Sequence, residues 1–180
     1  MHNDLAYVLI DREAIHRRVV ELARQIDADY RGRDMMMVGI LKGSFIFFAD
    51  LIREMSLNFP LDFMIVSSYG CGTTSSGNIR FIKGLDKDIA GKHLIIVEDI
   101  VDSGRTLSFL KSKLLDQGAE TIAVCSLLDK PSRRAVDLTI EYRGFEIPDE
   151  FVVGYGLDFA EKYRSLPEIG VLKPEVYTIV

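Results

Sequence analysis

Four short apolar segments recur along the chain, and each ends in polar or small residues. They occupy residues 35–41, 61–67, 94–97 and 121–128 and are rich in Val, Ile, Leu and Met. This composition is typical of strands that are buried on both faces, as in a parallel sheet. Segments with helical spacing lie between them, so the pattern predicts an α/β fold with a central, mostly parallel sheet flanked by helices.

Three segments have the pattern of helices. Asp11 can cap a helix whose apolar residues recur at steps of three and four from Ile15 to Ile26. An apolar helix is predicted over residues 45–55, and another begins near Leu107 and ends before Gly118. The basic residues on the first helix are interpreted as a solvated face; they are Arg12, Arg17, Arg18 and Arg24.

The segment that follows residues 94–97 combines two chemistries. Glu98, Asp99 and Asp102 are acidic, whereas residues 103–106 are Ser-Gly-Arg-Thr at the expected start of a helix. Amides and hydroxyls at a helix N-terminus suit a monophosphate, and the carboxylates suit a vicinal diol or a Mg²⁺ ion that holds it. Together they indicate a phosphorylated ribose; the alternative is a solvated acidic turn. Neither the Walker pattern nor Gly-x-Gly-x-x-Gly occurs at this loop, which disfavours a P-loop NTPase or a classical dinucleotide fold.

Residues 98–106, Glu-Asp-Ile-Val-Asp-Ser-Gly-Arg-Thr, resemble the phosphoribosyl-pyrophosphate signature of the type I phosphoribosyltransferases. In detail they are similar to the hypoxanthine (hypoxanthine-guanine) members, and the similarity runs from Leu9 to about Leu172. The resemblance implies the type I phosphoribosyltransferase fold in a single domain over residues 1–180. We expect its core at about residues 11–140 and a small hood from about residue 141 to 180, joined by the N-terminal segment.

The resemblance also implies purine salvage. The 5-phosphoribosyl group would pass from phosphoribosyl pyrophosphate to N9 of hypoxanthine or guanine, giving IMP or GMP and pyrophosphate, with Mg²⁺ as cofactor. Asp102 is the implied catalytic base at purine N7. The implied ligands of the phosphoribosyl group and its 5′-phosphate are Glu98, Asp99, Asp102, Ser103, Gly104, Arg105 and Thr106. The implied pyrophosphate ligands are Lys42, Gly43 and Arg164, and the implied purine-binding residues are Ile100, Lys130, Phe151, Val152 and Asp158. The implied metal ligands are Glu98, Asp99 and Asp158. The implied lid dipeptide is Ser68-Tyr69.

Considered without the resemblance, several of these residues have ordinary alternatives. Lys42 and Lys130 could be exposed lysines in turns, and Phe151 could be a core aromatic. Residues 68–77, with three glycines, could be a hairpin tip rather than a lid. The resemblance further implies a cis peptide bond between Leu41 and Lys42. The chain departs from many relatives at Arg105 and Ser44, where those relatives carry lysine and glycine.

Composition narrows the classes of partner. The net charge of −5 gives no basic field for nucleic acid, and no apolar run approaches the roughly 18 residues of a spanning helix. No signal peptide is visible after Met1, and Cys71 and Cys125 lack metal-type spacing, so we expect a cytoplasmic protein without a membrane partner. By analogy with relatives we expect a homodimer or homotetramer. The rival functions are a xanthine-guanine transferase, a non-enzymatic regulator that senses phosphoribosyl pyrophosphate, and an α/β sugar-phosphate binder without transfer. The implied role of Lys130 disfavours an adenine transferase.

Overall fold

A six-stranded sheet forms the centre of the protein. The computed structural model describes residues 2–68 and 79–178, so Tyr69 of the predicted lid lies outside the described residues. The strands of this sheet, in spatial order, are β4 (Ile79–Lys83), β3 (Leu61–Ser68), β2 (Met35–Leu41), β5 (His93–Val101), β6 (Thr121–Asp129) and β7 (Tyr142–Glu146). Only β4 runs antiparallel to its neighbour in this sheet. The predicted α/β fold with a mostly parallel sheet is confirmed.

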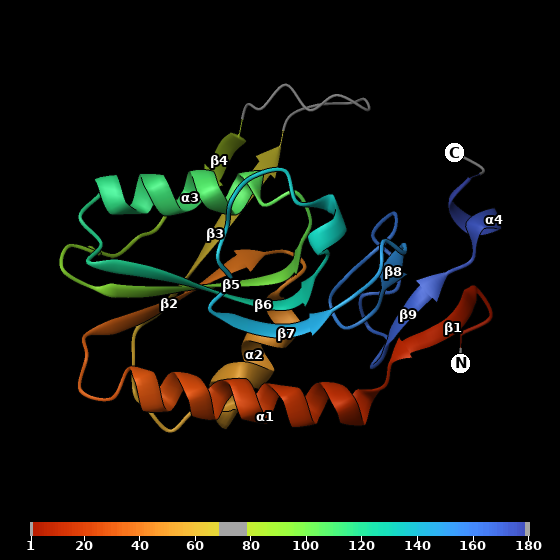
Figure 1. Ribbon diagram of the computed structural model, residues 1–180, viewed down its shortest axis with the longest axis horizontal. Helices are drawn as coiled ribbons and strands as arrows, with labels where there is room; N and C mark the ends of the chain where they lie inside the picture. The colour runs from red at the N-terminus through yellow and green to blue at the C-terminus, as the bar shows by residue number, and fades with distance from the viewer. Residues whose placement is uncertain (1, 69–78, 179–180) are drawn as a thin grey trace.

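Helices cover both faces of this sheet (Figure 1). α1 (Arg12–Asp29) and α2 (Phe45–Glu54) lie on one face, and α3 (Arg105–Asp116) lies on the other. Successive residues of β5 alternate between two apolar clusters: Ile95 packs on the α1 and α2 side, and Leu94 and Ile96 pack on the α3 side. A strand in this position needs apolar side chains on both faces, which explains the uninterrupted apolar runs of the sequence.

The ends of the helices follow from their local sequence. The Asp11 side chain accepts a hydrogen bond from the Ala14 amide at 2.7 Å, which confirms it as the N-cap of α1. After α3, Gly118 adopts a left-handed φ of +97° and its amide donates to the Leu115 carbonyl. Glycine adopts this conformation without a steric penalty, so it ends the helix where the sequence predicted.

Two details of the sheet differ from the sequence-based prediction. β5 extends past residue 97 to Val101, because Glu98, Ile100 and Val101 continue to pair with β6. The acidic residues Glu98 and Asp99 therefore lie within β5, near its carboxyl end, and the loop begins at Asp102. Arg18 also differs: its guanidinium donates to the carbonyl oxygens of Gly144 and Arg143, at 3.0 and 2.6 Å, and so ties α1 to β7 rather than only facing solvent.

A second, smaller sheet lies beyond the carboxyl ends of the parallel strands (Figure 1). It consists of β1 (Leu5–Ile10), β9 (Ile169–Leu172) and β8 (Val152–Val153), all antiparallel, and is followed by the short helix α4 (Pro174–Tyr177). The N-terminal segment thus pairs with the C-terminal region. β7 pairs in parallel with β6 and so belongs to the main sheet, although the hood was expected to begin at about residue 141.

Two further observations concern the chain as a whole. Cys125 is a buried free thiol, and burial raises its pKa well above the usual range. None of the helices in residues 2–68 and 79–178 combines the length and apolar character needed to cross a bilayer.

Candidate active site

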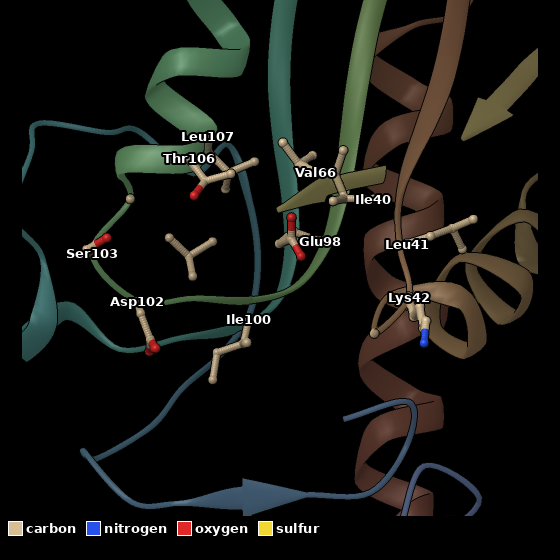
Figure 2. Close-up of a pocket in the computed structure, with 13 residues that line it drawn as sticks. Ile40, Leu41, Lys42, Val66, Glu98, Ile100, Asp102, Ser103, Thr106 and Leu107 are labelled. Atoms are coloured by element: carbon tan, nitrogen blue, oxygen red, sulfur yellow. The ribbon is translucent and has the colours of Figure 1, made fainter. Parts of the chain in front are cut away.

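A cavity of about 250 Å³ opens at the carboxyl ends of the central strands (Figure 2). Three segments form its wall: residues 40–43 at the end of β2 and just after it, Val66 of β3, and the end of β5 with the start of α3. The last segment contributes Glu98, Ile100, Val101, Asp102, Ser103, Gly104, Thr106 and Leu107. The structure therefore brings the predicted phosphoribosyl loop and the Lys42-Gly43 turn to one cavity, as expected for ligand sites at this edge of an open α/β sheet.

The loop of residues 102–106 has the geometry of an anion site. Gly104 precedes α3 with a φ of +76°, and a side chain at this position would press against Arg134 and Leu138. Gly104 has no side chain to cap α3, and the first amides of a helix have no intrahelical acceptor; the Arg105 amide donates to Ser103 Oγ at 3.4 Å. The carbonyl of Ser103 accepts a hydrogen bond from the Ala135 amide at 3.0 Å, which fixes the loop from outside the cavity. Open amides and nearby hydroxyls suit a phosphate.

The two acidic residues at the end of β5 have different surroundings. Burial, together with the neighbouring Asp99 carboxylate, raises the pKa of Glu98 well above its usual range. Asp99 accepts a hydrogen bond from the Ile100 amide at 2.9 Å, and its other oxygen lies against Gly43, where any side chain would collide with it. Asp99 thus links β5 to the Lys42-Gly43 turn, and only glycine leaves room for it.

The turn after β2 meets a second segment from the small-sheet region. The Leu41–Lys42 peptide bond is cis, as the family resemblance implies. Gly156 lies directly against the carbonyl of Gly43 and has a φ of +104°, so a side chain there would collide with that carbonyl. Arg164 donates to the Gly156 carbonyl at 2.7 Å. The structure therefore gathers all three predicted pyrophosphate ligands, Lys42, Gly43 and Arg164, in one region.

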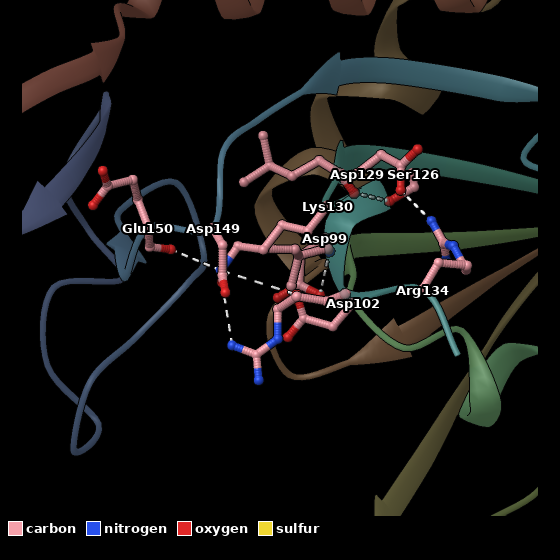
Figure 3. A network of polar contacts seen from close by, with 11 residues as sticks. Asp99, Asp102, Ser126, Asp129, Lys130, Arg134, Asp149 and Glu150 are labelled. Carbon is pink, nitrogen blue, oxygen red and sulfur yellow. Dashed lines mark hydrogen bonds and ion pairs between the residues drawn. The ribbon is translucent and has the colours of Figure 1, made fainter. Parts of the chain in front are cut away.

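Lys130 is buried beside Asp102 of the cavity wall and is not a surface turn lysine. Only 6% of the residue is exposed, and its ammonium donates to the Glu150 carbonyl at 2.7 Å (Figure 3). Its Nζ also lies 3.9 Å from Asp102 Oδ1 and 3.7 Å from Asp149 Oδ1. The Lys130 amide donates to the Val101 carbonyl at 2.9 Å. The predicted base residue and the predicted purine-specificity residue are therefore neighbours.

Phe151 is 39% exposed, so it is not a core aromatic. One face of its ring stacks on Tyr177 of α4, with centroids 4.8 Å apart and an interplanar angle of 18°. Phe159 contacts it edge-on. The next residue, Val152, is buried in β8 and pairs with β9. Asp158 is already engaged: its carboxylate pairs with Arg164 at 2.8 Å and accepts the Glu161 amide at 2.8 Å.

Comparison with known proteins decides the family. The family model described as phosphoribosyl transferase domain matches residues 9–160. The chain belongs to the phosphoribosyltransferase family. It is 48% identical over 177 residues to a hypoxanthine-guanine phosphoribosyltransferase of Bacillus subtilis, covering 98% of each chain. It is also 51% identical over 165 residues to a hypoxanthine phosphoribosyltransferase of Escherichia coli K12, covering 91% of this chain and 93% of the relative.

Solved structures agree with the phosphoribosyltransferase assignment. A crystal structure of a hypoxanthine phosphoribosyltransferase from Staphylococcus aureus superposes with a TM-score of 0.95 at 48% identity, covering 98% of this chain and 96% of that one. The fold is therefore that of the type I phosphoribosyltransferases. The chain is also 48% identical over 178 residues to the bifunctional protein TilS/HprT of Listeria innocua, of which it spans 28% of the length.

The residues of this phosphoribosyltransferase site fit a magnesium ion. Within residues 2–68 and 79–178, no three His, Cys, Asp or Glu side chains gather into a complete cage. Mg²⁺ is typically held by one or two carboxylates together with water and substrate phosphates, so a complete cage is not needed. The raised pKa of Glu98 beside Asp99 reflects unfavourable negative charge that a divalent cation would neutralise.

Sequence reasoning missed several residues that the structure places at the site. Asp149 and the Glu150 carbonyl hold Lys130, Tyr177 covers Phe151, and Glu161 contacts both Lys42 and Arg164. None of them stands in a motif, and all these contacts except that of Glu161 with Arg164 join residues well separated in the chain. The one available signal is that Asp149 and Glu150 directly precede Phe151, a predicted purine-binding residue.

Proposed function

We propose that this protein transfers the 5-phosphoribosyl group from phosphoribosyl pyrophosphate to N9 of a 6-oxopurine, hypoxanthine and also guanine, and releases pyrophosphate. The observation that carries the proposal is one cavity that joins the 102–106 loop, the acidic end of β5 and the Lys42-Gly43 turn, with buried Lys130 next to Asp102 of its wall. The relatives named as hypoxanthine phosphoribosyltransferases support this function over a xanthine-guanine transferase or a non-enzymatic regulator. The role would be purine salvage in the cytoplasm.

The reaction breaks the bond between ribose C1 and pyrophosphate. Positive charge develops on the sugar ring and negative charge on the departing oxygens, so catalysis requires orientation and electrostatic stabilisation. Residues 103–106 would hold the 5′-phosphate, and Glu98 and Asp99 would orient the ribose hydroxyls. Glu98 and Asp99 would hold one Mg²⁺ ion and Asp158 a second; bound metal would supply positive charge that stabilises the departing oxygens.

The leaving group would be held by Lys42, Gly43 and Arg164. A guanidinium presents several donors in a fixed plane, which suits the multiple oxygens of pyrophosphate. Arg164 is already oriented by the Gly156 carbonyl and the Asp158 carboxylate. The site is thus arranged in advance for a multiply charged anion.

The purine would lie between this sugar site and Lys130. Asp102 would accept the proton from N7, which makes N9 the stronger nucleophile. Lys130 would donate to the 6-oxo group, with Ile100 and Phe151 against the base, the Val152 backbone at its edge, and Asp158 in support. Adenine carries an amino group at C6, so two donors would face each other and adenine would be rejected. A lid at Ser68-Tyr69 and a dimeric or tetrameric assembly remain predictions.

A base panel tests the proposed reaction. The protein is incubated with phosphoribosyl pyrophosphate, Mg²⁺ and either hypoxanthine, guanine, xanthine or adenine, and nucleotide formation is followed. We expect product with hypoxanthine and guanine, and at least about 100-fold lower kcat/KM with adenine because a buried donor would be left unpaired. Absence of product with every 6-oxopurine would contradict the proposed function, whereas xanthine as the preferred base would favour the xanthine-guanine alternative.

A further inference from the structure

Glu161 joins the two cations that are proposed to bind pyrophosphate. Its two carboxylate oxygens each lie 3.2 Å from Lys42 Nζ, and one of them lies 3.5 Å from Arg164 Nη2. Lys42 and Glu161 are 119 positions apart in the chain, so the fold brings this anion to the turn after β2. A carboxylate thus occupies the position between the cations that an anionic leaving group requires.

The turn that carries Glu161 has an unusual backbone. Ala160 and Glu161 have φ values of +52° and +61°, and Tyr163 has +74°. Non-glycine residues rarely adopt this region, and they persist there only where surrounding contacts enforce it. Here the Asp158 carboxylate accepts the Glu161 amide at 2.8 Å, and Phe159 and Lys162 exchange backbone hydrogen bonds. The turn is therefore held in a conformation that directs Glu161 to the two cations.

We propose that Glu161 acts as a resident anion of the pyrophosphate subsite, which holds Lys42 beside Arg164 and competes with pyrophosphate for both. This inference rests on the proposed function, because it takes Lys42 and Arg164 as the ligands of the leaving group. It adds a residue that sets how tightly phosphoribosyl pyrophosphate and pyrophosphate bind.

The surroundings of Lys42 and Arg164 allow pyrophosphate to replace the Glu161 carboxylate. Arg164 retains its contacts with Asp158 and the Gly156 carbonyl, at 2.8 and 2.7 Å, when Glu161 moves away. Lys42 is 66% exposed and Glu161 is 67% exposed, so their pair can open without repacking of the core. Pyrophosphate carries more charge and more acceptor oxygens than one carboxylate, so it should displace Glu161.

The test compares pyrophosphate binding to the wild-type chain and to Glu161→Gln by calorimetry, in Mg²⁺ at low salt. We expect the variant to bind pyrophosphate about threefold to fivefold more tightly, because an exposed ion pair that competes with the ligand is worth a factor of that size. The gain should shrink as the salt concentration rises, since salt screens exposed pairs. Glu21→Gln is the matched control: it removes an exposed pair with Arg18, at 2.7 Å on α1, and should bind like wild type.

A second variant, Glu161→Ala, keeps the result independent of the amide introduced by Gln, and thermal melting verifies that each variant is folded. Affinity that is unchanged in both folded variants would overturn the inference. Affinity that is lower in both would also overturn it, because Glu161 would then support pyrophosphate binding rather than compete with it. Failure of the wild-type chain to bind pyrophosphate at all would instead contradict the proposed function itself.

Discussion

Replacing Asp102 with Asn is expected to lower kcat about 10²- to 10⁴-fold, the usual contribution of a positioned general base. Asp102 lines the cavity, its side chain is 48% exposed, and its carboxylate lies 3.9 Å from Lys130 Nζ. Asn preserves the size of the side chain but cannot accept the N7 proton. Steady-state kinetics with hypoxanthine and saturating phosphoribosyl pyrophosphate measure the loss.

Binding of phosphoribosyl pyrophosphate should survive this substitution, because the amides and hydroxyls of residues 103–106 are unchanged. Asp149→Asn is the matched control: Asp149 also lies beside Lys130, at 3.7 Å, and the substitution removes the same charge. We expect a much smaller loss there, since Asp149 has no assigned proton transfer. Equal losses in the two variants would indicate an electrostatic effect on Lys130, and unchanged turnover in Asp102→Asn would refute the base role.

Lys130→Met is expected to lower kcat/KM for hypoxanthine by about 10- to 100-fold, the range for one charge-assisted hydrogen bond to a substrate. Most of the change should be in KM for the base, because the donor to the 6-oxo group contributes mainly to purine binding. Met fills a similar volume in this buried position, so the effect isolates the ammonium. Initial rates with varied hypoxanthine measure it.

Lys130→Met should also reduce the difference in kcat/KM between hypoxanthine and adenine, since the Met side chain presents no hydrogen-bond donor to either base. KM for phosphoribosyl pyrophosphate should stay within about twofold of wild type, a change too small to indicate a lost hydrogen bond. Lys92→Met provides a control. Lys92 pairs with Asp34 at 2.7 Å and directly precedes β5, at the end of that strand opposite to the candidate site. Unaltered kinetics in Lys130→Met would show that another group recognises the 6-oxo position.

The sequence predicted the central sheet well, because burial on both faces imposes a pattern that can be read locally. β2 has the predicted bounds, and β3 differs by a single residue. β5 was predicted too short, since Glu98 and Asp99 are polar although the ladder with β6 continues past them. β7 was assigned to the hood because no local signal in Tyr142–Glu146 indicates which neighbouring sheet it joins.

The sequence-based prediction of the candidate site is limited to residues that lie in or match recognisable motifs. Most residues of the 98–106 segment, all except Asp99 and Arg105, line one cavity together with the Lys42-Gly43 turn. Glu161 was not predicted, because its role depends on a left-handed turn and on contacts with Lys42, which is distant in the chain. Tyr177 likewise meets Phe151 because α4 packs against the small sheet, a contact that no local sequence signal indicates.

A crystal structure of the protein with bound IMP tests the central claim most directly. We predict that the 5′-phosphate accepts hydrogen bonds from the amides and hydroxyls of residues 103–106, with the ribose hydroxyls facing Glu98 and Asp99 and the 6-oxo group within reach of Lys130. An IMP phosphate bound at any other place, away from the start of α3, would contradict the account.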